Sequence, residues 1–283
     1  MRKIQIVLAL SFGMVTSLAA QATLLGRDVN GSPGSFEAYY DDQLDITWLG
    51  NPSLAETLTL GLEKGGTLGN SGIDAYGRMP WTTAQLWIAA LNTLNYLGIN
   101  DWRLPNANPI NGTAYNFNPR NDGSRDVGIN ISAPGTIYAG STAHELAHLF
   151  FDTLGNHGSV TPDGLSSSDC GGSGEDDCMV NPGPFPVLDL YDANFGVWWY
   201  GVATSSGTAL NFEMDVGRTN STLQSMAIGY AWPVVGGDVF STPGGVPEPA
   251  TMGLVALGLA GLGLARRRGD SLVSFSAHWE SAW

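Results

Sequence analysis

The spacing of apolar and polar residues changes along the chain, and each change predicts a different element. Residues 36–51 (FEAYYDDQLDITWLGN) alternate well enough to predict a pair of short strands. From 82 to 97 the period lengthens to that of an amphipathic helix. Thr82 or Thr83 is expected to cap its start and Gly98 its end. The apolar residues expected on its buried face are Leu86, Ala89, Ala90 and Leu94.

Further apolar positions follow this helix. Trp102 and Leu104 are available for the core, and Pro105 ends their segment. A second helix is predicted near residues 145–154, with a buried stripe formed by Leu146, Phe150 and Leu154. Periodicity alone therefore predicts an α+β fold.

The N-terminal apolar run has the features of an export signal. Arg2 and Lys3 precede an apolar stretch, and Ala20-Gln21-Ala22 supplies the small-x-small pattern that signal peptidase recognises. We expect residues 1–22 to be a signal peptide that is cleaved after Ala22. An uncleaved anchor helix is the alternative, for which the apolar run is short.

The C-terminal apolar run has three parts (246–268, VPEPATMGLVALGLAGLGLARRR). The first is Val246-Pro247-Glu248-Pro249, whose prolines keep the segment extended and accessible to a processing enzyme. The second, 250–265, is long enough for a short membrane-spanning helix. The third is Arg266-Arg267-Arg268, which is expected to stay on the cytoplasmic side and hold the upstream body outside.

This three-part order resembles the PEP-CTERM sorting signal. The resemblance implies recognition and cleavage by an exosortase in a Gram-negative bacterium that produces exopolysaccharide. An ordinary tail anchor shares the apolar span and the arginines but does not explain Pro247-Glu248-Pro249. Residues 269–283 depart from the family pattern, which ends within a few residues of the basic cluster, so we treat them as an atypical extension.

Composition narrows the classes of function. The chain is 43% hydrophobic and has nine Trp, which is enough for one good-sized core and argues against disorder. Its 38 Gly and 13% charged residues favour a turn-rich, mixed or β-rich exported fold. Residues 23–246 hold seven Lys and Arg against 23 Asp and Glu, a net charge of −16. Such a surface repels phosphate backbones, which excludes nucleic-acid binding.

A second resemblance covers roughly residues 35–240. Its motifs are W-x-x-A from Trp81, G-x-x-DWRLP from Gly98, ELAHLF from Glu145, the pair Trp198-Trp199, and YAWP from Tyr230 followed by Gly237-Asp238-Val239. Together they resemble the Lcl C-terminal-like domain, an exported module. The resemblance implies a C-type-lectin-like fold of two helices and twisted antiparallel strands. It also implies that four tryptophans are core residues: Trp81, Trp102, Trp198 and Trp232.

These observations divide the chain into five parts. We expect a signal peptide at 1–22, the Lcl C-terminal-like domain at 23–240 and a linker at 241–246. The sorting signal with its transmembrane helix follows at 247–268, and the atypical extension is 269–283.

Cys170 and Cys178 are the two cysteines of the chain and lie in a stretch rich in Gly, Ser and Asp. In an oxidising compartment they are expected to form a disulfide that closes a surface loop. A metal site built on two cysteines would need further ligands.

His144-Glu145-Leu146-Ala147-His148 fits the H-E-x-x-H signature of zinc peptidases. In that signature two histidines one helical turn apart bind Zn²⁺, and the glutamate acts as general base. A catalytic zinc needs a third protein ligand, for which His157 and Glu175 are candidates. The structural alternative is a T-x-x-E capping box, in which Thr142 and Glu145 tie down the helix start. We predict the structural role, with no catalytic residue and no cofactor.

Two acidic clusters remain, Asp41-Asp42-Asp45 and Glu175-Asp176-Asp177. Either could bind Ca²⁺, but neither matches an EF-hand loop, and we interpret both as solvated surface. The sequence therefore predicts a non-enzymatic, exosortase-sorted surface or matrix protein. Its expected partners are signal peptidase, exosortase, the membrane through the C-terminal helix, and exopolysaccharide or other envelope components. A zinc metallopeptidase and a glycan-binding lectin-like module are the alternatives.

Overall fold

A computed structural model of the chain describes residues 23–31, 36–65, 72–168, 170, 178–185, 196–204, 207–226 and 228–240. They belong to one unit that ends at Phe240, and Ser241–Trp283 form a second unit outside the described residues. Within the described ranges, no helix has both the length and the apolar character needed to cross a membrane. The predicted transmembrane helix at 250–265 lies outside these ranges, as does the predicted signal peptide.

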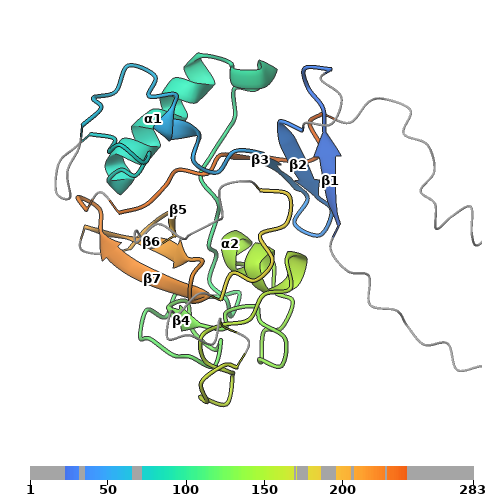
Figure 1. The fold of residues 1–283 in the computed structure, drawn as a ribbon. Helices are drawn as coiled ribbons and strands as arrows, with labels where there is room; N and C mark the ends of the chain where they lie inside the picture. The colour runs from blue at the N-terminus through green and yellow to red at the C-terminus, as the bar shows by residue number, and fades with distance from the viewer. Residues whose placement is uncertain are drawn as a thin grey trace, which may run out of the picture. The chain divides into compact units, whose positions relative to one another are not determined.

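The first sheet joins the two ends of the folded unit (Figure 1). Its order is β1 (Leu24–Arg27), β2 (Ala38–Asp41), β3 (Ile46–Leu49) and β8 (Val234–Gly236), and every neighbouring pair is antiparallel. The β2–β3 hairpin confirms the two strands predicted from alternation at 36–51. A bidentate ion pair from Arg27 to Asp238 also links the two chain ends.

The second sheet is also antiparallel and has the order β4 (Gly128–Ile129), β7 (Arg218–Leu223), β6 (Thr208–Glu213) and β5 (Val197–Ala203). Strand β5 contains the Trp198-Trp199 pair. Its first four residues are all buried, so this strand lies inside the core.

Helix α1 (Trp81–Thr93) confirms the predicted helix but turns a different face inward. Its buried residues are Thr83, Ala84, Trp87, Ile88 and Leu91. The predicted buried face is wrong, because Leu86 is 60% exposed and Leu94 is 54% exposed. The larger apolar surface lies on the opposite side, where the Trp87 Nε1 atom donates to the Leu58 carbonyl oxygen at 2.7 Å.

The predicted caps of α1 are also wrong. Pro80, with extended backbone, precedes the first helical residue, and the helix ends four residues before Leu97. Asn95 then adopts a left-handed conformation, with φ of 53°, which no right-handed helix can contain. A short 3₁₀ turn, η2 (Tyr96–Gly98), follows. Another such turn, η1 (Leu54–Glu56), precedes α1.

The second helical segment begins as α2 (Glu145–His148) and continues as a π-helical turn, η3 (Leu149–Thr153). Its predicted stripe of Leu146, Phe150 and Leu154 is buried, as expected. The Phe150 ring lies 5.6 Å from that of Phe212 in β6, so the segment packs against the second sheet.

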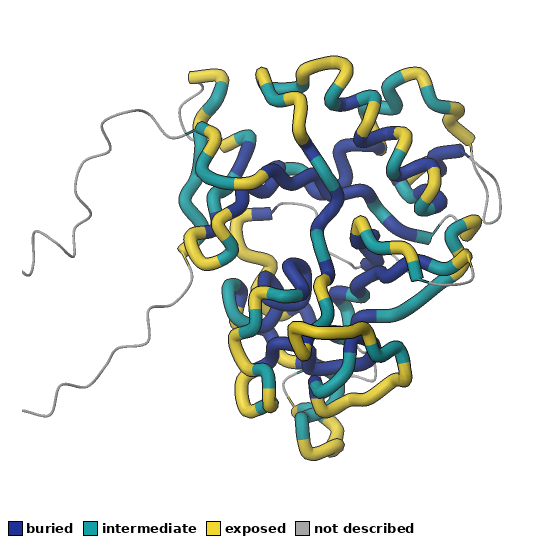
Figure 2. Tube along the Cα trace, turned by 180° about the vertical axis from the view of Figure 1, so that it is seen from behind, coloured by how far each residue is buried: buried dark blue, intermediate teal, exposed yellow. Residues whose placement is uncertain are grey.

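Aromatic side chains fill the space between these elements. The Trp232 ring centroid lies 4.9 Å from that of Trp48 and 6.1 Å from that of Trp198, so residues from both sheets meet there. Trp102, Trp198 and Trp232 are buried as predicted, whereas Trp81 is only half-buried. Figure 2 shows the buried stretches inside the unit and the exposed ones in the connecting loops.

Candidate functional site

The H-E-x-x-H residues do not lie on one continuous helix. His144 precedes the first residue of α2 and has extended backbone, with φ of −110° and ψ of 98°. Its backbone forms an isolated antiparallel bridge with Ala107, and the Glu145 amide donates to the Asn106 carbonyl oxygen. His144 therefore does not share a helix face with His148 in the way that the zinc-peptidase signature requires.

The imidazole of His144 is fully buried and lies beside another buried group. Its Nε2 atom is 3.3 Å from Oδ1 of Asp126, and its ring meets the Tyr200 ring edge to face at 5.7 Å. Among the described residues its Nδ1 atom has no hydrogen-bond partner.

Glu145 is held by three donors. Its two carboxylate oxygens accept hydrogen bonds from the Arg103 guanidinium, each at 2.8 Å. The Asn106 amide donates to the same carboxylate at 2.7 Å. This arrangement replaces the predicted capping box, because Thr142 lies outside the helix start and no side chain caps α2. A carboxylate with these three partners is poorly placed to take a proton from water.

His148 is buried on α2 and contacts a different set of atoms. Its Nδ1 atom lies 3.2 Å from the Ser141 carbonyl oxygen and 3.5 Å from Oδ2 of Asp152. Burial raises the pKa of Asp152 to about 6, although the nearby His148 opposes that shift. The two histidines are thus engaged with separate acidic residues.

Tyr200 connects this region to the second sheet. Its hydroxyl accepts a hydrogen bond from the Ala147 amide at 3.1 Å. Complete burial raises the pKa of Tyr200 far above its ordinary value. The phenol therefore stays neutral and acts as a polar link between β5 and α2.

The described residues supply no third ligand of the kind that a catalytic zinc needs at this site. In the described part of the chain, no group of three or more His, Cys, Asp or Glu side chains is placed to hold a metal ion. His157 is described and belongs to no such group, whereas Glu175 lies outside the described residues.

Several partners of the motif were not identified from the sequence. Asp152 stands four residues after His148, a spacing that places two side chains together on a helix and could have indicated the contact. Asp126 and Tyr200 lie far from the motif in sequence, and no local pattern marks them. Arg103 belongs to the DWRLP motif, and nothing in that motif indicates its contact with Glu145.

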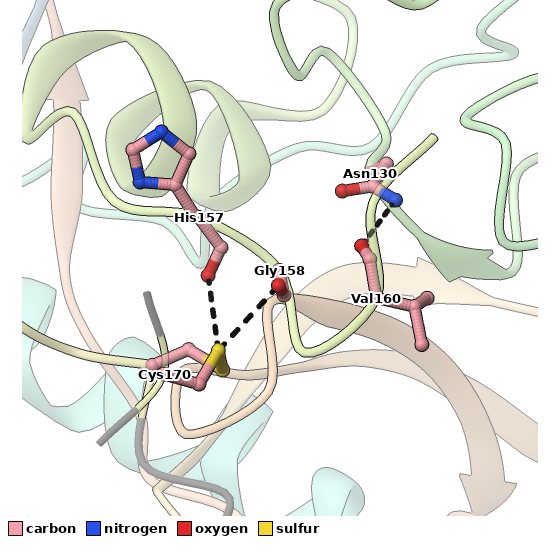
Figure 3. Close-up of a disulfide and its surroundings, with 6 residues drawn as sticks. Asn130, His157, Gly158, Val160 and Cys170 are labelled. Carbon is pink, nitrogen blue, oxygen red and sulfur yellow. Dashed lines mark hydrogen bonds between the residues drawn. A yellow bond between two sulfur atoms is a disulfide. The ribbon is translucent and has the colours of Figure 1, made fainter. Parts of the chain in front are cut away.

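The predicted disulfide between Cys170 and Cys178 is present (Figure 3). The Cys170 sulfur lies 3.5 Å from the Gly158 carbonyl oxygen and 3.9 Å from that of His157. A disulfide sulfur carries no hydrogen, so these are packing contacts. Nearby, the Asn130 side chain donates to the Val160 carbonyl oxygen at 2.8 Å.

The first acidic cluster is not uniformly solvated, which corrects the interpretation of Asp41. This side chain is fully buried and accepts hydrogen bonds from the Gln43 and Leu44 amides and the Thr153 hydroxyl. The Asp41 carboxylate therefore stabilises the turn after β2 and connects this turn to η3 through Thr153. Asp42 is exposed and accepts from the Thr23 amide. The second cluster, 175–177, lies outside the described residues.

The comparisons with known proteins concern the C-terminal end of the chain. A family model of the PEP-CTERM protein-sorting motif matches residues 245–268. No curated protein matches the chain, and no solved structure matches it.

The matched motif defines an exported protein that is anchored in the membrane before it is processed by an exosortase. The chain therefore carries a PEP-CTERM protein-sorting motif at residues 245–268. Its predicted sorting residues, Val246 to Pro249 and Arg266 to Arg268, fall within the match but outside the described residues, as do Ala20 and Ala22 of the predicted cleavage site.

Proposed function

We propose that the folded unit is a non-enzymatic protein of the cell surface or extracellular matrix, released from its sorting tail and in contact with exopolysaccharide. The observation that carries this proposal is the sorting motif at 245–268, which directly follows a folded unit ending at Phe240. Signal peptidase would remove residues 1–22 before exosortase acts.

The engagement of the H-E-x-x-H residues supports the non-enzymatic part of the proposal. A hydrolytic zinc needs two convergent imidazoles, a third ligand and a carboxylate free to activate water. Here His144 lies outside the helix, and Glu145 is bound to Arg103 and Asn106. The same contacts are what a structural junction between two chain segments requires.

The lectin-like fold remains part of this proposal. Two antiparallel sheets and two helical segments are compatible with the C-type-lectin-like arrangement that the Lcl C-terminal-like resemblance implies. Because a fold alone does not determine a function, glycan binding by this chain depends on particular exposed residues.

Processing by exosortase tests the sorting step. In a host that has an exosortase, the doubly substituted Pro247→Ala, Pro249→Ala chain should keep its tail and stay in the membrane fraction. The matched control is Pro243→Ala, which lies just outside the motif. Intact-mass measurement and cell fractionation report the result. Equal processing of the double variant and the control would overturn the sorting assignment.

Metal content tests the non-enzymatic assignment. The exported protein, purified without a metal-affinity tag, should contain well below one zinc per chain by mass spectrometry. About one zinc per chain, lost in the His148→Gln variant while the fold is retained, would establish the metallopeptidase alternative instead.

A further inference from the structure

The loop between α1 and β4 carries two aromatic rings that lie against each other, one exposed and one half-buried. The Tyr115 and Phe117 ring centroids are 5.2 Å apart, and the ring planes are inclined by 16°, so the rings are stacked. Phe117 packs partly against the core, whereas Tyr115 is 40% exposed. Each ring has one face against the other ring. The exposed part of Tyr115 stays in contact with solvent after folding, so it does not stabilise the folded state through burial.

The backbone of this loop is held by hydrogen bonds to Asp126, whose side chain is fully buried. Oδ1 of Asp126 accepts from the Ile110 amide at 2.7 Å, and Oδ2 accepts from the Asn116 amide at 2.5 Å. The Tyr115 hydroxyl donates to the Ala107 carbonyl oxygen at 2.8 Å. Because both the backbone and the phenol are held, the aromatic pair is preorganised and a ligand need not order it.

Uncharged amide groups flank the ring pair. The side-chain oxygens of Asn111 and Asn116 accept hydrogen bonds in local turns, and the backbone amide of Asn118 donates one of them to Asn116. No hydrogen bond joins their side-chain amide nitrogens to another residue in the described part of the chain. The whole segment 108–119 (NPINGTAYNFNP) contains no ionisable side chain except the tyrosine hydroxyl.

We propose that the Tyr115–Phe117 loop is a binding site for a neutral polysaccharide. This inference rests on the proposed contact with exopolysaccharide and assigns that contact to the Tyr115–Phe117 loop. The axial C–H bonds of a pyranose ring carry partial positive charge and stack on the negative face of an aromatic ring. Side-chain amides donate to and accept from sugar hydroxyls.

Charge selects among the polymers that could stack on the ring pair. The net charge of −16 on residues 23–246 repels acidic polysaccharides and nucleic acids. Segment 108–119 itself has neither a cation for an acidic sugar nor an anion for an amino sugar, and the first charged side chain after it is the exposed Arg120, so the acidic pool is tested beside the neutral one. A neutral polymer matches both the charge and the hydrogen-bonding groups of the loop.

Affinity electrophoresis tests the site. The full chain is expressed in an exosortase-containing host and isolated as its exported product. The probes are the neutral and acidic pools of the host exopolysaccharide, separated by anion exchange. Tyr115→Leu removes the aromatic face, whereas Tyr115→Phe keeps the ring and loses only the hydrogen bond to Ala107. Tyr76→Leu removes an exposed tyrosine outside the loop and is the matched control.

We expect the neutral pool to retard the wild type and Tyr76→Leu alike, and Tyr115→Phe only slightly less, because that variant keeps the aromatic face and loses the hydrogen bond that orients it. Tyr115→Leu should bind about tenfold more weakly, with unchanged intrinsic tryptophan fluorescence. Equal binding of Tyr115→Leu, or a preference for the acidic pool, would overturn the site and leave the proposed function standing. Absence of binding to either pool by the wild type would overturn the polysaccharide contact itself.

Discussion

The Nε2 atom of His144 lies 3.3 Å from Oδ1 of Asp126, and neither side chain is exposed to solvent. Burial by itself raises the pKa of this carboxyl group, but hydrogen bonds from His144 and the Asn116 and Ile110 amides lower it below its ordinary value. One carboxylate thus joins the start of α2 to the loop that presents the aromatic pair.

Asp126→Asn should destabilise the folded unit at neutral pH. The amide keeps the shape of the side chain but has one acceptor oxygen, so it cannot serve the Ile110 and Asn116 amides on two different oxygens. We expect a loss of about 1–3 kcal/mol in the free energy of unfolding, measured by urea denaturation. The exposed Asp101→Asn control should stay within about 0.5 kcal/mol of wild type.

The contribution of Asp126 should also depend on pH. Because its pKa is lower in the folded state, its stabilising effect is present above the ordinary carboxyl pKa and is lost as the pH falls through the folded value. The difference between wild type and Asp126→Asn should therefore shrink in acid. A difference that grows as the pH falls would contradict this account of the carboxylate.

The Arg103–Glu145 pair should show strong energetic coupling. A double-mutant cycle with Arg103→Ala and Glu145→Ala is expected to give about 1–3 kcal/mol, because the carboxylate is nearly buried and the contact is bidentate. The more exposed pair of Arg218 and Glu213 is the control and should couple by less than about 1 kcal/mol. Comparable values for the two pairs would argue that Glu145 is not held as described.

The inward face of α1 can be tested with two matched substitutions. Ile88→Glu places a charge in the core and should prevent folding or cost several kcal/mol. Leu86→Glu, two residues earlier and 60% exposed, should change stability by no more than about 0.5 kcal/mol. Circular dichroism during thermal unfolding separates the two cases, and a reversed order of stability would support the face predicted from the sequence.

Asp215→Asn should stabilise the protein above about pH 6. Burial, together with repulsion from Glu213, raises the pKa of Asp215 to about 6. The folded state therefore binds a proton that the unfolded state releases, and wild-type stability declines as the pH rises from about 4 to about 6. We expect a gain on the order of 1 kcal/mol at pH 7 that disappears below pH 4. A gain that persists at low pH would point to a different cause.

Alternation along the chain was sufficient to predict the β2–β3 hairpin, whose turn is short, although all four residues of β3 are buried and not only those on one face. The existence of α1 was predictable in the same way, but its orientation was not. Apolar residues lie on both sides of this helix, and the choice depends on Trp87 reaching the Leu58 carbonyl oxygen, 29 residues away. No window of local sequence contains that acceptor.

Local sequence was also insufficient to predict the structure of the candidate metal motif. The H-E-x-x-H pattern assumes a helix that includes its first histidine. In the structure His144 has extended backbone and forms an antiparallel bridge with Ala107. The carboxylate of Glu145 is likewise occupied by Arg103, 42 residues earlier. These partners come from the long connection between α1 and α2, whose course (Figure 1) is set by tertiary contacts that are not apparent from residue spacing.

The pairing of β3 with β8 determines when the folded unit can be completed. Ile46 lies opposite Gly236, so the sheet that begins with the first strands of the unit is completed by its last. Such long sequence separation slows folding, because the intervening chain must be gathered before the contact forms. The first sheet therefore stays incomplete until β8 is available, and the unit reaches its native topology only when its first and last strands have been brought together.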